Sequence, residues 1–360
     1  MKQANTPFGR PVSSKTDTRV ITLERFTPAF VDPSLTTEEL RRKFGTFLLT
    51  GTEKNCSLKK GLNAESKRYA LKSPLFADDR NINEGLVKRH LEEAQRIMLL
   101  EEYRSALAVS NVKGFPRVYG IGYSGGFPVI VLEYINGTSL TEALDEFPLN
   151  DEGTGVSPSV AASIIQTATK ILLNVQCLDG TFVHRDLSPR NILIKTDEHP
   201  LYEQVDQEVF DLRLVDMGSA TYRIGTAPSS TIKHGIWRFG TAEYAAPEML
   251  TRDIEGIEAK RYSETIDTYA LCSILYLLLT GEPPFSLFKR VNSSPYLIKT
   301  KEEPRKLAVA PRCDTLLQLA IDGITAQQER RYSLRSLYQA LSSWNKSHKE
   351  DCETPPRPNR

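Results

Sequence analysis

The segment that most constrains the fold and chemistry of this chain of 360 residues is residues 183–193, which read Val-His-Arg-Asp-Leu-Ser-Pro-Arg-Asn-Ile-Leu. Asp186 and Asn191 stand five positions apart in this polar loop, which leads into an apolar strand. That spacing can place a carboxylate beside an incoming hydroxyl group and an amide oxygen beside a metal ion bound to phosphate. Phosphoryl transfer depends mainly on positioning and on neutralising charge, and a loop of this kind can supply both.

Two further segments follow the loop, and their order argues against a chance occurrence of so short a motif. Residues 212–215 alternate like a short strand and lead to Asp216, Met217 and Gly218. An isolated Asp-x-Gly sequence usually forms a turn, but the position of this one favours a metal ligand at Asp216. Farther along, residues 240–248 read Gly-Thr-Ala-Glu-Tyr-Ala-Ala-Pro-Glu.

With these three segments the chain resembles the protein kinase family, whose motifs H-R-D-L-x-x-x-N, D-F-G and A-P-E occur in the same order. The resemblance covers roughly 300 residues, the size of one two-lobed catalytic domain. It implies an α+β fold, with a strand-rich small lobe that contains one long helix and a mainly helical large lobe. It also implies ATP and Mg²⁺, with Asp186 as the catalytic base and with Asn191 and Asp216 as metal ligands. Residues 240–248, here called the peptide segment, would seat the protein substrate.

The resemblance implies two further contacts that would support the site. Glu248 would pair with an Arg near the end of the domain, and Arg331 stands where that Arg is expected. Asp267 looks like the residue that opens a buried helix and steadies the catalytic loop. Taken alone, Glu248 and Arg331 would be solvated surface charges, and Asp267 would be an ordinary helix N-cap.

Upstream of the loop the resemblance is weaker, and its departures concern the phosphates. Arg68–Lys72 resembles the strand V-A-I-K, so Lys72 would bridge the α- and β-phosphates of ATP. Gly51 lies 21 residues before Lys72, as the first glycine of G-x-G-x-x-G would. In that register Glu53 and Cys56 replace the other two glycines, so the loop fails as a motif although its flanking strands and spacing survive.

A carboxylate from the helix after this strand should orient Lys72. The apolar residues that recur there at helical spacing are Val87, Leu91, Ala94 and Met98. The candidate carboxylates are Glu92, Glu93, Glu101 and Glu102. Counting back from the next strand favours Glu102.

The adenine end of the nucleotide site is implied by an apolar run. Phe127–Glu133 is typical of a strand, in which Leu132 would lie beside the adenine pocket and Glu133 would begin the hinge between the lobes. The nucleotide-binding residues implied in all are Gly51, Leu58, Ala70, Lys72, Glu102, Leu132, Glu133 and Leu193.

Two opposing signals concern the hydroxyl that receives the phosphate. Many Ser/Thr kinases carry Lys two residues after the catalytic Asp, where this chain has Ser188. Arg190 instead resembles the form found in receptor tyrosine kinases, and a cation there can also reach the γ-phosphate, so Arg190 is counted as catalytic. The peptide segment resembles that of Ser/Thr kinases, and we give it more weight.

Composition and charge narrow the class of protein. With 40% hydrophobic residues and a formal net charge of +1, the chain has no basic excess that would indicate a nucleic-acid partner. Its five cysteines are dispersed and lack a C-x-x-C, which favours reduced thiols in the cytoplasm over zinc or disulfides. Residues 1–43 lack the apolar core of a signal peptide, and the longest apolar stretch, residues 270–280, is too short to span a bilayer.

The chain is expected to have three parts, and its oligomeric state is not indicated. The parts are an N-terminal extension over 1–42, a kinase domain over 43–347 with an N-lobe (43–135) and a C-lobe (136–347), and a tail over 348–360. The N-terminal extension is rich in Thr, Ser and Pro and is expected to be flexible. Residues 195–210 are acidic and are expected to form a surface insertion.

The sequence therefore predicts an active protein kinase that phosphorylates Ser or Thr of a protein substrate. A pseudokinase scaffold is one alternative, favoured by Glu53 and Cys56. A small-molecule kinase of related fold is another, and the peptide segment argues against it.

The resemblance also suggests how the chain could be regulated. In the family, an Arg at the position of Arg185 often binds a phosphate group on the segment that follows the metal ligand. The candidate site of phosphorylation in this chain is the hydroxyl-rich stretch of residues 226–231. The alternative is that Arg185 makes only structural hydrogen bonds.

Overall fold

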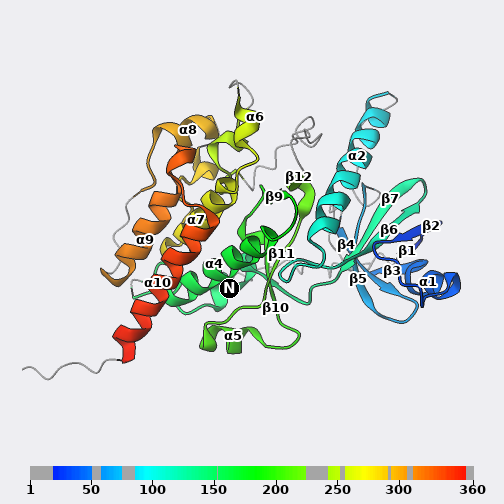
Figure 1. Cartoon of the computed structure of the whole chain (residues 1–360), viewed down its shortest axis with the longest axis horizontal. Coiled ribbons are helices and arrows are strands. Elements are labelled where there is room, and N and C mark those ends of the chain that lie inside the picture. The colour runs from blue at the N-terminus through cyan, green and yellow to red at the C-terminus, as the bar shows by residue number, and fades with distance from the viewer. Residues whose placement is uncertain are drawn as a thin grey trace, which may run out of the picture. The chain divides into compact units, whose positions relative to one another are not determined.

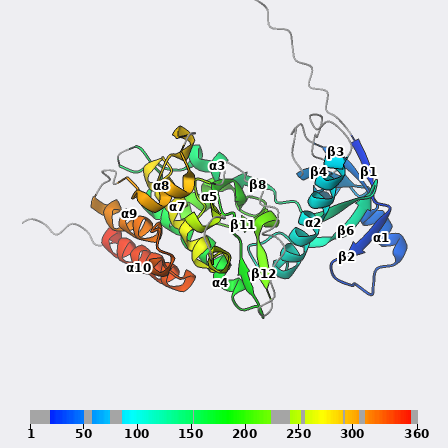
Figure 2. The same ribbon diagram turned by 90° about the horizontal axis from the view of Figure 1, so that it is seen from above.

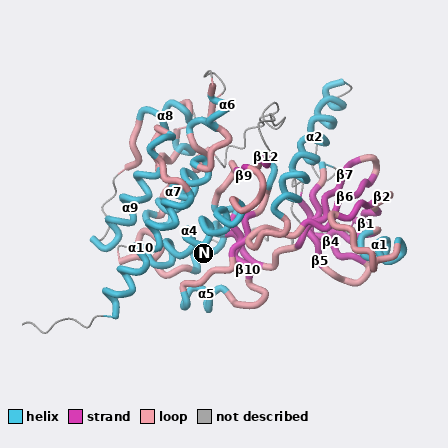
Figure 3. The backbone as a smooth tube through the Cα atoms, in the orientation of Figure 1, coloured by secondary structure: helices cyan, strands magenta, loops and turns pink. Residues whose placement is uncertain are grey.

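The computed structural model describes residues 19–50, 58–74, 86–151, 153–223, 242–251, 256–290, 293–305 and 311–353, with only the backbone of 19, 86–92, 311–313 and 348–353. The chain divides into two compact units. A small unit comprises Met1–Glu92 and Tyr119–Tyr134, and a large unit comprises Glu93–Val118 and Ile135–Arg360. Strands predominate in the small unit and helices in the large one, which confirms the predicted α+β class (Figure 3).

The small unit is built on one sheet of seven strands in the order β1-β3-β4-β5-β7-β6-β2. The predicted strands Arg68–Lys72 and Phe127–Glu133 are β5 and β7, which pair antiparallel with Ala70 opposite Leu132. The other strands are β1 (Arg19–Thr22), β2 (Arg25–Pro28), β3 (Thr46–Thr50), β4 (Leu58–Asn63) and β6 (Val118–Ser124).

Residues 19–42, which lie within the predicted N-terminal extension, contain two strands and most of a helix. β1 pairs with β3 at one edge of the sheet, and β2 pairs with β6 at the other edge. α1 (Thr37–Phe44) follows with a capping box between Thr36 and Glu39. It packs against β3 and β4 and lies beside the sheet of the small unit (Figure 2). Strands this short, whose partners lie far along the chain, leave little local periodicity in a sequence.

The core of the small unit sets the direction of the side chains on β5. Phe44, at the end of α1, lies 5.7 Å from Tyr69 between ring centroids. Tyr69 and Leu71 belong to this core, and because side chains alternate along a strand, Ala70 and Lys72 face the opposite side. The buried core residues are Ile21, Leu23, Phe44, Phe47, Leu49, Tyr69, Leu71, Val129 and Val131.

The large unit is organised around α7 (Thr265–Thr280), which contains the apolar stretch noted in the sequence. Every residue of α7 after the first is buried, because α4 (Pro158–Val175) and α9 (Pro311–Gly323) pack against it. α10 (Leu334–Glu353) packs mainly against α4 (Figure 1). A helix that is apolar on nearly all sides is expected in such a central position. No helix among the described residues is long and apolar enough to cross a bilayer.

A second sheet, with strand order β11-β10-β8, lies in the large unit. β10 (Ile192–Lys195) and β11 (Leu212–Leu214) pair antiparallel, and α5 (Leu201–Gln207) lies in the segment between them. Buried Gln204 closes this insertion by donating to the backbone oxygens of Lys195 and His199, both at 2.7 Å. The remaining helices and strands are α2 (Leu86–Val109), β8 (Gly137–Ser139), α3 (Leu140–Ala143), β9 (Thr181–Val183), β12 (Thr221–Arg223), α6 (Ile257–Lys260) and α8 (Pro295–Lys301).

Candidate active site

The predicted catalytic loop is fixed by its own hydrogen bonds. Asn191 ends a short 3-10 helix, Pro189–Asn191, and its Nδ2 donates to the backbone oxygen of Asp186 at 2.8 Å. The amide oxygen of Asn191 is therefore the side-chain atom that can face a cation. The carboxylate of Asp186 is buried in the same loop, so the two predicted catalytic side chains are positioned by one short turn.

Asp267, in the first turn of α7, connects this loop to the core of the large unit. Its Oδ2 accepts the backbone N–H of His184 at 2.8 Å, and its Oδ1 accepts that of Arg185 at 2.9 Å. Burial raises the pKa of Asp267 to about 6, although both N–H bonds and the charge of Arg185 oppose the rise. The carboxylate is thus charged at neutral pH and makes strong hydrogen bonds. The prediction that Asp267 steadies the loop is confirmed.

The β10–β11 hairpin brings Asp216 to the same place as Asn191. Asn191 directly precedes β10 and Asp216 follows β11, so antiparallel pairing leaves both at one end of the hairpin. The backbone N–H of Val215 donates to the backbone oxygen of Asn191 at 2.9 Å. Asp216 has a left-handed backbone, with a φ of 66°, and its Oδ1 accepts the N–H of Gly218 at 3.3 Å. The two predicted metal ligands therefore come together.

His184 connects the catalytic loop to the backbone just before Asp216. Its Nε2 lies 3.1 Å from the oxygen of Val215, which can only accept, so Nε2 carries the proton. Burial lowers the pKa of His184 to about 4, against the charge of Asp216, and the ring is neutral at physiological pH. A neutral histidine can lie in the core without adding a charge close to the metal ligands.

Glu102 of α2 lies against the turn that contains Asp216. A Cβ added at Gly218 would lie 3.4 Å from Oε2 of Glu102 and 3.1 Å from Oδ1 of Asp216. A side chain at position 218 would therefore crowd the carboxylate of Asp216 and contact that of Glu102. Ser105, one turn along α2, donates to the oxygen of Ala220 at 3.2 Å, which fixes α2 against this segment.

Burial distinguishes Glu102 from the other candidate carboxylates of α2. Glu102 is buried, Glu101 is half-buried and Glu93 is exposed, while the side chain of Glu92 lies outside the described residues. A carboxylate that faces solvent is a poor candidate for orienting a buried lysine. Among the candidates whose side chains the structure describes, Glu102 is the most buried.

The small unit carries most of the other nucleotide-binding candidates. Lys72 is buried at the end of β5, on the same face as Ala70. On the neighbouring strands, Leu58 lies opposite Lys72 and Leu132 lies opposite Ala70. Residues opposite each other in an antiparallel pair share a face, so the sheet brings these four predicted residues together.

The remaining nucleotide-binding candidates are Glu133, Leu193 and Gly51. Glu133 is the last residue of β7 and is half-buried, and Leu193 is half-buried in β10 of the large unit. Gly51, with Glu53 and Cys56, lies outside the described residues.

Arg190 is the exposed cation of the catalytic loop. Burial raises the pKa of Tyr244 to about 12, and the positive charge of Arg190 opposes that rise. Tyr244 belongs to the peptide segment, so Arg190 acts electrostatically on the region where the resemblance places the substrate. Ser188, at the position where Lys is common, is buried.

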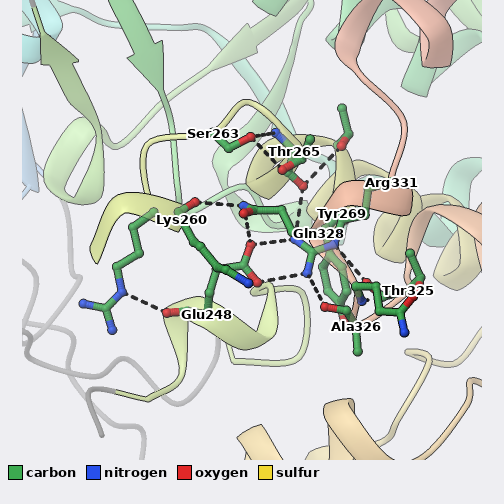
Figure 4. A network of polar contacts seen from close by, with 12 residues as sticks. Glu248, Lys260, Ser263, Thr265, Tyr269, Thr325, Ala326, Gln328 and Arg331 are labelled. Carbon is green, nitrogen blue, oxygen red and sulfur yellow. Dashed lines mark hydrogen bonds and ion pairs between the residues drawn. The ribbon is translucent and has the colours of Figure 1, made fainter. Parts of the chain in front are cut away.

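The end of the peptide segment is locked by the predicted pair of Glu248 and Arg331 (Figure 4). Nη1 and Nη2 of Arg331 donate to Oε1 and Oε2 of Glu248 at 2.6 and 2.9 Å, and both residues are buried. Two further contacts were not predicted. Gln328 donates to Oε1 of Glu248 at 3.0 Å, and Nε of Arg261 donates to the backbone oxygen of Glu248 at 2.8 Å. Neither residue belongs to a recognisable motif, so the sequence carries no signal for them.

Arg185 is engaged within the large unit. Its Nε donates to the backbone oxygen of Arg261 at 2.8 Å, and its guanidinium lies 4.5 Å from the centre of the Tyr262 ring. The guanidinium of Arg223 lies 4.0 Å from the same ring. Residues 226–231 lie outside the described residues, so phosphate binding by Arg185 stays a prediction.

The chain is similar in sequence to known proteins over the part that contains the catalytic loop. The family model of the protein kinase domain matches residues 77–341, a range that begins after Lys72. The chain is 29% identical over 226 residues to the serine/threonine-protein kinase PknB of Mycolicibacterium smegmatis, covering 59% of this chain and 31% of that protein. It is 33% identical over 159 residues to the human serine/threonine-protein kinase DCLK3, covering 43% of this chain and 19% of that protein. The chain therefore spans less than a third of the length of these relatives.

The matched range contains the catalytic loop, the β10–β11 hairpin and the pair of Glu248 and Arg331. Sequence similarity and geometry thus concern the same part of the molecule, and the match extends over most of the chain. On these grounds the chain belongs to the protein kinase family.

Proposed function

We propose that this chain is an active protein kinase that transfers the γ-phosphate of ATP to a Ser or Thr hydroxyl of a protein substrate. The observation that carries the proposal is the joint position of Asp186, Asn191 and Asp216 at one end of the β10–β11 hairpin. Asp267 holds that arrangement through two charge-assisted hydrogen bonds. Positioning of this kind is the main demand of phosphoryl transfer.

In the proposed reaction, Asp186 orients the substrate hydroxyl and accepts its proton as the new O–P bond forms. The bond between the γ-phosphorus and the bridging oxygen breaks, and ADP leaves with the electron pair. Asn191 and Asp216 offer hard oxygen donors suited to Mg²⁺, which neutralises phosphate charge when bound. Lys72 would bind the phosphates, and Arg190 would add a positive charge beside the transferred group.

The preference for Ser or Thr is supported by the relatives, which are named serine/threonine-protein kinases, and by the peptide segment. Arg190 is the opposing signal. Identification of the phosphorylated residue types by mass spectrometry tests the preference. Phosphotyrosine without phosphoserine or phosphothreonine would contradict it.

The activity itself is tested by transfer of labelled phosphate from ATP, with Mg²⁺, to the chain or to casein. Asp186→Asn should reduce transfer by a factor of about 10² to 10⁴, because a proton acceptor is lost while the shape of the site is kept. Thermal stabilisation by ATP should persist in the variant. Equal transfer by the two proteins would show that Asp186 is not the base.

A pseudokinase scaffold is the second candidate, and the residues at positions 53 and 56 favour it. Glu53 would bring negative charge near polyphosphate, and the family match begins only at residue 77, beyond this loop. If the scaffold proposal holds, the double variant Glu53→Gly and Cys56→Gly should raise transfer from nothing to a measurable rate. Transfer by the unmodified chain excludes the scaffold. We expect transfer with weakened ATP affinity, because the sequence keeps the other charged residues that the resemblance places around the phosphates.

A further inference from the structure

A lysine without a role in the proposed reaction is buried in the large unit. Lys299 of α8 is 1% exposed, and its Nζ donates to the backbone oxygens of Glu243 and Ala245 at 2.8 and 2.7 Å. Burying an ammonium group costs free energy unless its hydrogens find acceptors. Here the acceptors belong to the peptide segment, so α8 is joined to that segment by a buried lysine.

The surroundings of Lys299 suit a positive charge. Nζ lies 5.2 Å from the centre of the Tyr269 ring and 5.6 Å from that of Phe285, distances at which an aromatic ring attracts a cation. Burial nevertheless lowers the pKa of Lys299 to about 7. The ionisable groups around it are Glu243, Glu248, Tyr269 and Arg331. The two carboxylates favour the charged lysine, and Arg331 opposes it.

Glu243 is held a second time, through its side chain. Its Oε1 accepts the backbone N–H of Phe288 at 2.7 Å, in the 3-10 helix Leu287–Lys289. Within the described part of the chain its buried Oε2 has no hydrogen-bond partner. The positive charge of Lys299 offsets the burial of this carboxylate. The same residue is therefore fixed at its backbone by α8 and at its side chain by the preceding 3-10 helix.

The two carbonyl groups that Lys299 binds belong to the residues on either side of Tyr244. The two bonds therefore restrain the backbone before and after Tyr244, and the charge of Arg190 acts on Tyr244. We propose that Lys299 is a positioning residue that holds residues 243–245 in the shape needed to seat the protein substrate. This inference rests on the kinase activity proposed above and names a residue that sets the affinity for protein rather than for ATP.

The test compares Lys299→Met and Lys299→Gln with Lys301→Met, which changes an exposed lysine on the same helix. Methionine occupies a similar volume but leaves both carbonyl groups without a donor, whereas glutamine can still donate two N–H bonds without a charge. Lys299→Met should raise the KM for casein about tenfold and leave the KM for ATP within about twofold. Lys299→Gln should recover part of the loss, and Lys301→Met should match the unmodified chain.

An unchanged KM for casein in Lys299→Met would overturn the inference. Equal rises of the KM values for casein and ATP would overturn it too, because they would indicate general damage to the large unit. A similar loss in Lys301→Met would show that the effect does not depend on the buried contacts.

Amide hydrogen exchange of residues 242–250 does not depend on phosphotransfer, so it separates this inference from the proposed activity. Exchange should be faster in Lys299→Met than in the unmodified chain, and it should be unchanged in Lys301→Met. If the unmodified chain transfers no phosphate, the kinase proposal fails, while faster exchange still supports the positioning role. Unchanged exchange in Lys299→Met, or in Lys299→Gln if the first variant does not fold, rejects that role.

Discussion

Arg331 binds both carboxylate oxygens of Glu248 with its two terminal nitrogens, although the two residues stand 83 positions apart in the chain. The pair joins the end of the peptide segment to the turn before α10, and the guanidinium lies 4.8 Å from the centre of the Tyr269 ring. Because both residues are buried, neither charge has water to replace its partner. Removing one partner should therefore lower the free energy of unfolding by more than the intact pair contributes to it.

Arg331→Ala should lower the free energy of unfolding by about 3–5 kcal/mol, because it leaves Glu248 charged and buried without its partner. The measurement is urea unfolding at neutral pH. Arg330→Ala, which changes the exposed neighbour, should shift stability by no more than about 0.5 kcal/mol. Equal losses in the two variants would show that the ion pair has no special part in stability.

Asp216→Ala should abolish the dependence of nucleotide binding on Mg²⁺, because it removes the carboxylate among the two proposed metal ligands. Thermal stabilisation by ATP, measured with and without Mg²⁺, checks this. Asp206→Ala, an exposed position on α5, is the control and should behave like the unmodified chain. If ATP stabilises the unmodified chain equally with and without Mg²⁺, the metal role of Asp216 is wrong.

Phosphate should appear within residues 226–231 when the chain is incubated with ATP, because a phosphorylated hydroxyl can pair with Arg185 and order the segment. Mass spectrometry locates the modification, and Asp186→Asn serves as the inactive control. The contacts of Arg185 with Arg261 and Tyr262 represent the alternative, a purely structural role. A fully active protein with no phosphate anywhere in residues 219–239 would support that alternative.

Much of the site could be predicted because its residues belong to short segments with a fixed order. Asp186, Asn191 and Asp216 each belong to a motif of a few residues, and the hairpin between them needs only two apolar strands. Asp267 and Arg331 could be placed because each lies at a recognisable distance from those motifs. Their partners in the structure are the predicted ones.

Contacts that arise only from long-range folding could not be predicted. β1 and β2 are four residues each and find their partners at opposite edges of the sheet, so nothing local distinguishes them from a polar extension. Lys299 stands two residues from exposed Lys301 on one short helix, and the sequence alone does not tell which lysine is buried. Charged residues are seldom buried, so a general rule would place both side chains in solvent.

Lys299 should also give the folded chain a pH dependence whose sign follows from its burial. Its pKa is about 7 in the folded chain, against an ordinary value of 10.5. Between these values the unfolded chain binds more protons than the folded chain, so the free energy of unfolding should rise with pH. One such group contributes a slope of at most about 1.4 kcal/mol per pH unit. Below about pH 7 the lysine is protonated in both states, and its contribution no longer changes.

Urea unfolding between about pH 7 and pH 10 measures this dependence. Tyrosine and cysteine side chains titrate in part of the same range, so the informative quantity is the difference between variants. Lys299→Met should lose the rise that Lys299 contributes, whereas Lys301→Met should keep it. If the unmodified chain and Lys299→Met show the same slope, burial does not lower the pKa of Lys299 in the folded chain.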